Sequence, residues 1–349
     1  MPPSRFPPYT APVILFEPVA RPPMTEYGIA IPISPSSVKR TLERLMADPH
    51  FGPRKDEWLY TAPGEPLRRE FVELVHDPAY VDRLLGESAE EEVIKTYELI
   101  DRQGHYHRYD PHHGNRPLSE MVKYALITTA GSVASCEHAL RDGSCFFLGG
   151  GMHHAKRATG DGFCLVNDPV IAARASQFKG LASTVWIIDL DVHKGDGTSD
   201  LTFDDPTIRT LSIHMSRGWP MDRPEHLPDG SLHPSHVPSD VDIPVDVNEE
   251  DAYVPLLAHG LEQMESFGLP DLAIILYGAD PYERDELPSS GGIRLSLSQM
   301  MERDQLVYNY LEERRIPRAY LKAGGYGNHA WEPLTQFLTW YLRKELDKH

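Results

Sequence analysis

One short segment of the chain, WIIDLDVHKGDG, joins an apolar run to several ionisable residues. Its first part, residues 186–188, could belong to any buried strand. Its second part holds residues that carry charge or bind metals, namely Asp189, Asp191, His193 and Asp196. A carboxylate removed from water costs much free energy unless it is paired or coordinates a metal. The segment therefore predicts that paired side chains or metal ions compensate these acids.

The same segment offers a pair of metal ligands. Asp191 and His193 are two residues apart, so in a regular strand both side chains would point to the same face. Asp280, at the end of another apolar run, could supply a third ligand. Three protein ligands and one open position are typical of catalytic zinc, which activates a water and polarises a carbonyl. Taken alone, an Asp-x-His pair is more often a strand end in contact with solvent.

Other residues of the chain could move protons. The adjacent His153 and His154 could act as acid and base, with Asp189 and Asp196 orienting them through hydrogen bonds. Tyr326, which follows Ala-Gly-Gly, could donate a hydrogen bond to a developing oxyanion. Together these groups could hydrolyse an amide or an ester. Each also has a simpler explanation, because adjacent histidines are often surface residues and Gly-Gly-Tyr is often only a turn.

These residues stand at the ends of short apolar runs. The runs are SCFFLGGG, STVWIIDLD, IRTLSIH, DLAIILYGAD and RAYLKAGGYG. Helical patterns alternate with them at residues 119–141, 250–267 and 298–315, so the sequence predicts an α/β protein with a parallel sheet covered on both faces. In such sheets, ligands bind outside the carboxyl ends of the strands. Polar residues at five strand ends therefore favour one shared site over five unrelated features.

Two further helices are expected nearer the N-terminus. In SPSSVKRTLERLMAD, one apolar face would contain Val38, Leu42, Leu45 and Met46. In HDPAYVDRLLG, Asp77 is the expected N-cap, Pro78 fits the first helical position and Gly86 would end the helix. The proline-rich stretches 106–117 and 219–238 are expected to be long loops, which are often functional in compact domains.

Bulk composition limits the class of protein. The chain has 349 residues, 40% of them hydrophobic, and no internal repeat or linker, so a single domain over 1–349 is expected. A net charge of −18 argues against nucleic acid as the principal partner and would suit a cationic substrate, such as a lysine-rich peptide or a polyamine. Three cysteines, no signal-peptide core and no apolar run near 20 residues predict a cytoplasmic protein without a membrane partner.

Five motifs of this sequence occur together in a known family. They are GGGMHHAKRATGDGFCLVND, IIDLDVHKGDGT, LSIH, GADPYERDEL and AGGYG. In their order and spacing the chain resembles the zinc-dependent histone deacetylase superfamily, which includes acetoin-utilisation proteins and acetylpolyamine amidohydrolases. With ELVHDPAYVDRLL the likeness covers about residues 25–335, and LDVHKGDGT and SDVDIPV look nearest to the bacterial and class IV-like branch. The resemblance implies the arginase–deacetylase fold, an α/β domain with a central, mainly parallel sheet flanked by helices.

The resemblance also implies catalytic roles. One zinc ion per chain would be held by Asp191, His193 and Asp280. His154 would be the main general base and acid, with Asp196 facing it. His153 would be its electrostatic partner, with Asp189 facing it in turn. Tyr326 would polarise the acyl carbonyl.

A potassium ion and a substrate channel are implied as well. The ion would be bound by the carbonyls of Asp189, Asp191, His193 and Ile213 and by side-chain oxygens of Asp189 and Ser212. Gly162 and Phe163 would line a channel for the lysine-like stem, with Trp219 on the opposite wall. Leu287 would give the channel rim an apolar surface. The chain departs from many relatives at Lys194, where they have His or Gln.

The expected function is hydrolysis of an amide. The leading hypothesis is a deacylase that removes acetyl or longer acyl groups from a lysine-like amine of a peptide or protein. The alternative is an acetylpolyamine or other small-molecule amidohydrolase. A metal-stabilised scaffold without activity is a third possibility, which the complete set of catalytic residues disfavours. The sequence leaves homo-oligomer formation open.

Overall fold

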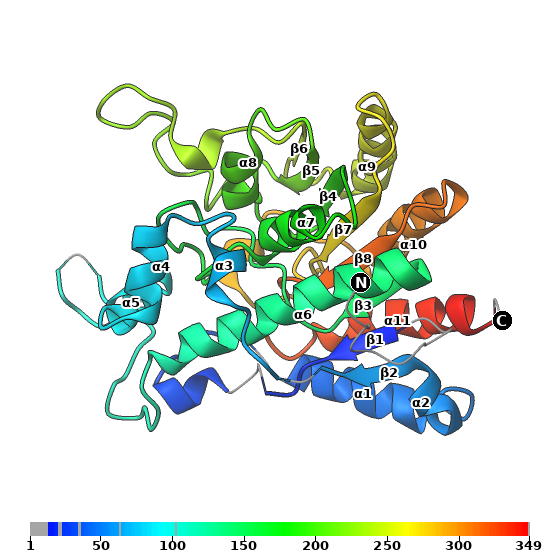
Figure 1. Cartoon of the computed structure of the whole chain (residues 1–349), viewed down its shortest axis with the longest axis horizontal. Coiled ribbons are helices and arrows are strands. Elements are labelled where there is room, and N and C mark those ends of the chain that lie inside the picture. The colour runs from blue at the N-terminus through cyan, green and yellow to red at the C-terminus, as the bar shows by residue number, and fades with distance from the viewer. Residues whose placement is uncertain (1–12, 20–22, 34–35, 63, 102, 348–349) are drawn as a thin grey trace.

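The fold is built on one eight-stranded sheet in which every pair of neighbours is parallel. The structure is a computed structural model, and it describes residues 13–19, 23–33, 36–62, 64–101 and 103–347. The strand order is β2-β1-β3-β8-β7-β4-β5-β6 (Figure 1). The strands are β1 (Val13–Phe16), β2 (Leu59–Thr61), β3 (Ser144–Phe147), β4 (Val185–Asp189), β5 (Ile208–Met215), β6 (Val241–Val245), β7 (Leu272–Tyr277) and β8 (Arg318–Lys322).

Helices pack on both faces of this sheet. They are α1 (Ser36–Ala47), α2 (Lys55–Trp58), α3 (Arg69–Val72), α4 (Pro78–Leu85), α5 (Ala89–Thr96), α6 (Glu120–Asp142), α7 (Asp168–Phe178), α8 (Asp196–Thr202), α9 (Glu250–Glu265), α10 (Leu297–Glu313) and α11 (Trp331–Leu346). One apolar cluster joins the sheet to α1, α9, α10 and α11, and the other joins it to α3 through α7. None of the helices in the described ranges has the length and apolar character needed to cross a bilayer.

Strand β4 shows why its sequence is apolar without alternation. Trp186 and Ile188 belong to the first apolar cluster, whereas Val185 and Ile187 belong to the second. Because both faces of a parallel sheet are covered, successive side chains are buried on opposite sides. The polar residues can begin only where the strand ends, at Asp189.

The five predicted apolar runs form a contiguous set of strands. They correspond to β3, β8, β7, β4 and β5 in the order in which these strands lie in the sheet. Since all neighbours are parallel, the carboxyl ends of these strands lie along one edge. The prediction of an α/β protein with a parallel sheet is confirmed, and the residues singled out at the strand ends are brought to the same edge.

The predicted helices are confirmed with small shifts at their ends. Residues 119–141, 250–267 and 298–315 correspond to α6, α9 and α10. In α1 the three residues Val38, Leu42 and Leu45 are buried as expected. Met46 is instead 40% exposed, because at 3.6 residues per turn it lies about 80° round the helix from Val38, at the edge of the apolar stripe.

Helix α4 begins at Pro78 and ends before Gly86, as predicted. The expected cap at Asp77 differs in kind, because its side chain makes no capping hydrogen bond. Its backbone carbonyl accepts instead, from the N–H groups of Tyr80 and Val81. The proline therefore fixes the start of this helix, and the Asp77 carboxylate does not contribute to it.

Three strands were not expected from the sequence. β1 and β2 are short and extend the sheet beyond β3, and β6 extends it beyond β5. Pro244 pairs with His214 in the β5–β6 register, and a proline is tolerated there because β6 is an edge strand. The stretch 219–238 is a loop, as predicted, with one short 3-10 turn at Pro234–His236.

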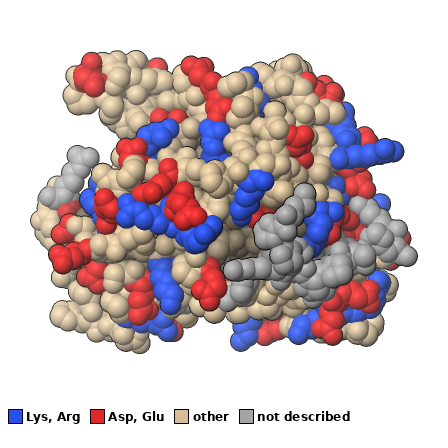
Figure 2. Space-filling view, in the orientation of Figure 1, with Lys and Arg blue, Asp and Glu red and all other residues tan. Residues whose placement is uncertain are grey.

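The surface charge is mixed on the face drawn in the space-filling view. Figure 2 shows acidic and basic side chains interspersed over this face, around a shallow hollow. The net charge of −18 therefore does not gather here into one acidic patch.

Candidate metal centre and active site

Three potential metal ligands converge at the ends of β4 and β7. Asp191, His193 and Asp280 are all at least 97% buried, and one ligand atom of each lies within 4.8 Å of the others. His193 Nδ1 lies 3.1 Å from Asp191 Oδ1 and 3.5 Å from Asp280 Oδ2. Asp280 Oδ2 has no hydrogen-bond partner. The structure thus brings together the three residues that the sequence nominated.

The electrostatics of this group fit a bound cation. Burial and the negative charge of Asp191 raise the pKa of Asp280 to about 7, because two ionised carboxylates this close together repel each other. A divalent cation would offset this repulsion and bind Asp280 Oδ2, the oxygen that has no hydrogen-bond partner. Two carboxylates and one imidazole are a donor set that zinc accepts, with a fourth position left for water. The residues present therefore fit zinc.

Backbone groups hold the two carboxylates in place. Gly324 N–H donates to Asp191 Oδ2 at 2.9 Å, and Val192 N–H donates to Asp280 Oδ1 at 3.2 Å. A Cβ at Gly324 would lie 2.1 Å from Asp280 Oδ2, and a Cβ at Gly278 would lie 2.5 Å from Asp191 Cα. Only glycine leaves room for these approaches. The Ala-Gly-Gly motif therefore packs its backbone directly against the metal ligands.

A buried arginine fixes the two strand ends that carry the carboxylates. Arg303 of α10 is 0% exposed, and its Nη1 donates to Leu190 O at 3.2 Å and to Gly278 O at 2.9 Å. Its Nε donates to Asp304 at 2.8 Å. These carbonyls lie just before Asp191 and Asp280, where β4 and β7 have stopped pairing. Sequence reasoning missed Arg303 because it lies within a helix pattern, far from any motif.

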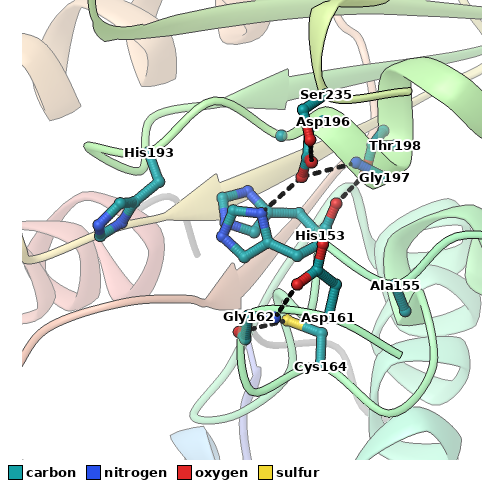
Figure 3. Close-up of polar contacts among 12 residues, drawn as sticks. His153, Ala155, Asp161, Gly162, Cys164, His193, Asp196, Gly197, Thr198 and Ser235 are labelled. Atoms are coloured by element: carbon teal, nitrogen blue, oxygen red, sulfur yellow. Dashed lines mark hydrogen bonds and ion pairs between the residues drawn. The ribbon is translucent and has the colours of Figure 1, made fainter. Parts of the chain in front are cut away.

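The two histidines have the carboxylate partners that were predicted. His153 Nδ1 lies 2.6 Å from Asp189 Oδ2, and His154 Nδ1 lies 2.8 Å from Asp196 Oδ1. The two rings are 3.9 Å apart, and both histidines line the same cavity as His193 (Figure 3). Because an ionised carboxylate only accepts, each Nδ1 carries the proton and each Nε2 is left for chemistry.

The environments of the two histidines separate their pKa values. Burial lowers the pKa of His153, but the charges of Asp189 and Asp191 outweigh it and raise the value to about 9. Burial and the positive charge of His153 lower the pKa of His154 to about 4. Pairs of titrating groups whose pKa values are shifted in opposite directions are typical of acid–base sites. His154 is the member suited to accept a proton at neutral pH.

Tyr326 lines this cavity too, at the turn after β8. Desolvation and the negative charges of Asp280 and Asp191 raise the pKa of Tyr326 well above its ordinary value, so its hydroxyl keeps its proton. The backbone N–H of Tyr326 donates to Asp285 Oδ2 at 2.7 Å. Asp285 therefore sets where the tyrosine turn lies. No pattern in the sequence indicated this role for Asp285.

Gly162 and Phe163 line the cavity as expected, whereas Trp219, expected on the opposite wall, is not among the residues that line it and packs against Gly162. A Cβ at Gly162 would lie 2.3 Å from Trp219 Cη2, and the Trp219 ring lies 4.5 Å from the ring of His154. Gly162 and Phe163 both have a positive φ, of 51° and 66°, so this wall turns in a left-handed conformation. The cavity beside it has a volume of about 220 Å³. It is also lined by the apolar side chains of Met24, Ile33, Met121 and Met152.

The structure corrects the expected position of Leu287. This side chain is 5% exposed and is not among the residues that line the cavity. Asp285 accepts hydrogen bonds from the N–H groups of both Leu287 and Tyr326, which folds the loop back on itself and turns Leu287 inward. The neighbouring Glu286 is exposed instead, and it accepts from Asn328 N–H at 2.9 Å.

The residues expected to bind potassium lie next to the metal centre. Asp189 and Ser212 pair in the β4–β5 register and are 3% and 2% exposed. Ile213 follows in β5 and is fully buried. Lys194 is also buried, and its Nζ lies 3.3 Å from a carboxylate oxygen of Asp242 on β6. The unusual lysine is therefore compensated by an acid of the neighbouring strand.

Comparison with known proteins agrees with this geometry. Residues 31–342 match the family model described as histone deacetylase domain. An uncharacterized protein of Picosynechococcus sp. is 30% identical over 75% of this chain and 77% of its own length. The acetoin utilization protein AcuC of Staphylococcus aureus strain Mu50 is 26% identical over 86% and 73%, respectively. The crystal structure of the HDA15 HD domain has a TM-score of 0.68 at 16% identity, covering 96% of this chain and 90% of that one.

These comparisons settle two predictions made from the motifs. The similarity to the HDA15 HD domain confirms the arginase–deacetylase fold, with its parallel sheet flanked by helices. The family model covers most of the chain, including the proposed metal ligands, the two histidines and Tyr326. The chain belongs to the histone deacetylase family.

Proposed function

We propose that this protein is a zinc-dependent amide hydrolase that removes acetyl or longer acyl groups from lysine-like amines of peptides or proteins. The observation that carries the proposal is the convergence of the buried Asp191–His193–Asp280 group, the two histidines and Tyr326 on one cavity. Membership of the histone deacetylase family supports the same class of reaction.

Each group has a part in this reaction. Bound zinc would activate a water molecule and polarise the acyl carbonyl. Tyr326, with its hydroxyl protonated, donates a hydrogen bond to the oxygen that gains negative charge. His154 Nε2 accepts the proton of the attacking water and returns it to the leaving amine, while Asp196 holds the ring through Nδ1. His153, paired with Asp189, keeps a positive charge beside it.

The substrate stem would lie in the cavity beside the wall formed by Gly162 and Phe163, which leads to His154 and Tyr326 and suits an unbranched methylene chain. Trp219 packs against Gly162 and His154 and so supports this wall from behind. The apolar residues that line the cavity suit an acyl group. We also propose that a potassium ion is bound by carbonyls of Asp189, Asp191, His193 and Ile213 with side-chain oxygens of Asp189 and Ser212, where it would compensate the buried Asp189.

One observation favours the second candidate, an acetylpolyamine or other small-molecule amidohydrolase. The Glu286 carboxylate is exposed and bound to the backbone at Asn328, two residues after Tyr326. A carboxylate at this position could pair with the second ammonium group of a polyamine. Because that pair would be screened by solvent, its contribution is about 1 kcal/mol or less.

The test measures metal content and turnover side by side. The purified protein should hold one zinc per chain, and Asp280→Ala should lose both zinc and activity. Values of kcat/KM should be higher for acetyl-lysine and longer-acyl-lysine peptides than for acetylspermidine and acetylputrescine. A preference for the polyamines would exchange the two candidates. Full activity in a verified zinc-free Asp280→Ala protein would refute the metal mechanism.

A further inference from the structure

The acid that orients His154 is held by more groups than its histidine. Asp196 is 0% exposed, and its Oδ1 accepts from His154 and from Gly197 N–H at 2.8 and 3.0 Å. Its Oδ2 accepts from Lys156 Nζ at 2.8 Å and from the Ser235 hydroxyl at 2.6 Å. Figure 3 shows Ser235 beside Asp196. Lys156 is adjacent in sequence to the histidine pair, but Ser235 comes from the distant 219–238 loop.

Ser235 is placed by the loop's own contacts. It is fully buried within the 3-10 turn Pro234–His236, and its N–H donates to His233 Nδ1 at 3.1 Å. The side chain of His236 contacts Arg223 O through Nε2 at 2.9 Å. The two ends of the loop are therefore tied together, and the hydroxyl is aimed at Asp196.

A second contact joins the loop to the channel wall. Arg223 makes a two-pronged ion pair with Asp161, with Nη2 at 2.8 Å from Oδ1 and Nη1 at 2.5 Å from Oδ2. Asp161 directly precedes Gly162 and accepts from its N–H at 3.0 Å. The Arg223 guanidinium also lies 5.3 Å from the centre of the Trp219 ring. Arg223 thus contacts both the Trp219 ring and Asp161, the residue that precedes Gly162 in the channel wall.

A direct hydrogen bond and a shared lysine connect the two contacts, because Arg223 Nη1 also donates to Ser235 Oγ at 3.2 Å. Lys156 Nζ lies 2.8 Å from Asp196 Oδ2 and 3.0 Å from Asp161 Oδ2. The cluster therefore holds two carboxylates, Asp196 and Asp161, against two cations, Lys156 and Arg223. Because the charges balance, removal of Arg223 would disturb the whole cluster and not only the loop. The loop, the channel wall and the acid of the His154 pair form one connected network.

We propose that Arg223 and Ser235 are positioning residues that make the 219–238 loop a working part of the active site. Ser235 fixes the Asp196 carboxylate so that Oδ1 stays directed at His154. Arg223 holds Trp219 against Gly162 and so fixes the channel wall that Gly162 and Phe163 form. This inference rests on the proposed deacylase function. It assigns the two residues to different steps: Ser235 supports proton transfer by His154, and Arg223 supports substrate binding.

The first kinetic test removes the Ser235 hydroxyl. Ser235→Ala should lower kcat for an acetyl-lysine peptide by about 10- to 150-fold, the usual effect of losing a hydrogen bond to a charged group, with KM changed less than about twofold. Ser235→Cys, which keeps a weak donor, should recover part of the loss. The control is Ser239→Ala, because Ser239 is also buried in this region but bonds Ser199 at 2.9 Å. Equal effects of the two alanine variants would overturn the role of Ser235.

The second kinetic test separates the arginine from the serine. Arg223→Gln should raise KM about tenfold with a smaller effect on kcat, and Arg223→Lys should recover part of the binding. Asp161→Asn added to Arg223→Gln should cost little more than the single change, because it restores the charge balance of the cluster while Lys156 stays paired with Asp196. Arg217→Gln is the control, since that side chain is 85% exposed near the same loop. A loss confined to kcat in Arg223→Gln would overturn the assignment of Arg223 to the channel.

A third measurement does not depend on turnover. Hydrogen–deuterium exchange of peptides from 216–238 should become faster in Ser235→Ala and Arg223→Gln and stay unchanged in the two controls. Unchanged exchange in both test variants would overturn the anchoring itself. Faster exchange with unaltered kinetics would overturn the link to catalysis. If the parent protein hydrolyses no acyl-amine but exchange behaves as stated, the proposed function fails while the anchored loop stands.

Discussion

The buried Arg303 offers a sharp test of how the metal centre is held. Its Nη1 donates to Leu190 O and Gly278 O, the carbonyls that precede the two carboxylate ligands. Replacing Arg303 alone would leave the buried Asp304 without its cation, which costs about 3–5 kcal/mol and would confuse folding with metal binding. The double change Arg303→Met with Asp304→Leu removes both charges and keeps apolar volume in place.

The expected effect is on metal affinity. Without Arg303, the end of β4 and the end of β7 keep the hydrogen bond from Val192 N–H to Asp280 but lose the guanidinium that joins their carbonyls, so Asp191 and Asp280 lose part of their fixed separation. Loss of a group that supports metal ligands typically weakens metal binding by 10- to 100-fold. We therefore expect the double variant to bind zinc about 10- to 100-fold more weakly, measured by competition with a chelator. The absorption spectrum of the cobalt-substituted protein should change as well.

A matched control separates this effect from general destabilisation. Arg318 on β8 is 2% exposed and its Nη2 lies 2.7 Å from Glu345 Oε1, so it is another buried ion pair of the same core. Arg318→Met with Glu345→Leu should change the free energy of unfolding to a similar extent and leave zinc affinity unchanged. Zinc affinity within twofold of the parent protein in a folded Arg303 double variant would refute the reasoning.

Four further predictions concern the site and its surroundings. Tyr326→Phe should retain zinc, measured by elemental analysis, and lower kcat by about 10²–10³; an unchanged kcat would move the oxyanion role elsewhere. His154→Ala should lower kcat more than His153→Ala, because only His154 is suited to accept a proton at neutral pH, and the reverse order would exchange their roles. Gly162→Ala should lower kcat/KM about 10²-fold, since its Cβ would lie 2.3 Å from the Trp219 ring. Wild-type kinetics would mean that the Trp219 ring moves to accommodate the methyl group. Burial alone would raise the pKa of Asp242, but the hydrogen bond from His214 and the positive charge of Lys194 outweigh this effect and lower the pKa to about 2. This is below the unfolded value of about 3.9, so the contribution to stability is complete above that value and lost as pH falls toward 2; denaturant titrations of Asp242→Asn should show a flatter acid limb.

The strand ends were predictable because their chemistry conflicts with their surroundings. Acids and histidines directly after fully apolar runs need compensation, and a parallel sheet brings such ends to one edge. The strand set β3, β8, β7, β4 and β5 and the site that they share followed from that argument. The short edge strands escaped it, because β1 and β2 have only 4 and 3 residues and β6 contains a proline.

The supporting residues could not be found in this way. Ser235, Arg223 and Arg303 act through the reach of a side chain from a loop or a helix, and that reach depends on a chain path which local patterns do not encode. The same limit explains Leu287. Its spacing from Asp280 placed it in a loop near the cavity, but the two hydrogen bonds to Asp285 decide which side of that loop faces inward.

The place of β8 in the sheet has a consequence for how the protein forms. β8 pairs with β3 on one side and with β7 on the other, and β3 and β7 have no direct pairing. Until β8 is in place, the sheet consists of two separate parts, β2-β1-β3 and β7-β4-β5-β6. During synthesis the chain must therefore be made as far as Lys322 before the two parts of the sheet can join, because β8 ends there. The same late strand delivers Gly324 and Tyr326, so a nascent chain could hold zinc ligands from one half while remaining unable to catalyse until the last strand closes the gap.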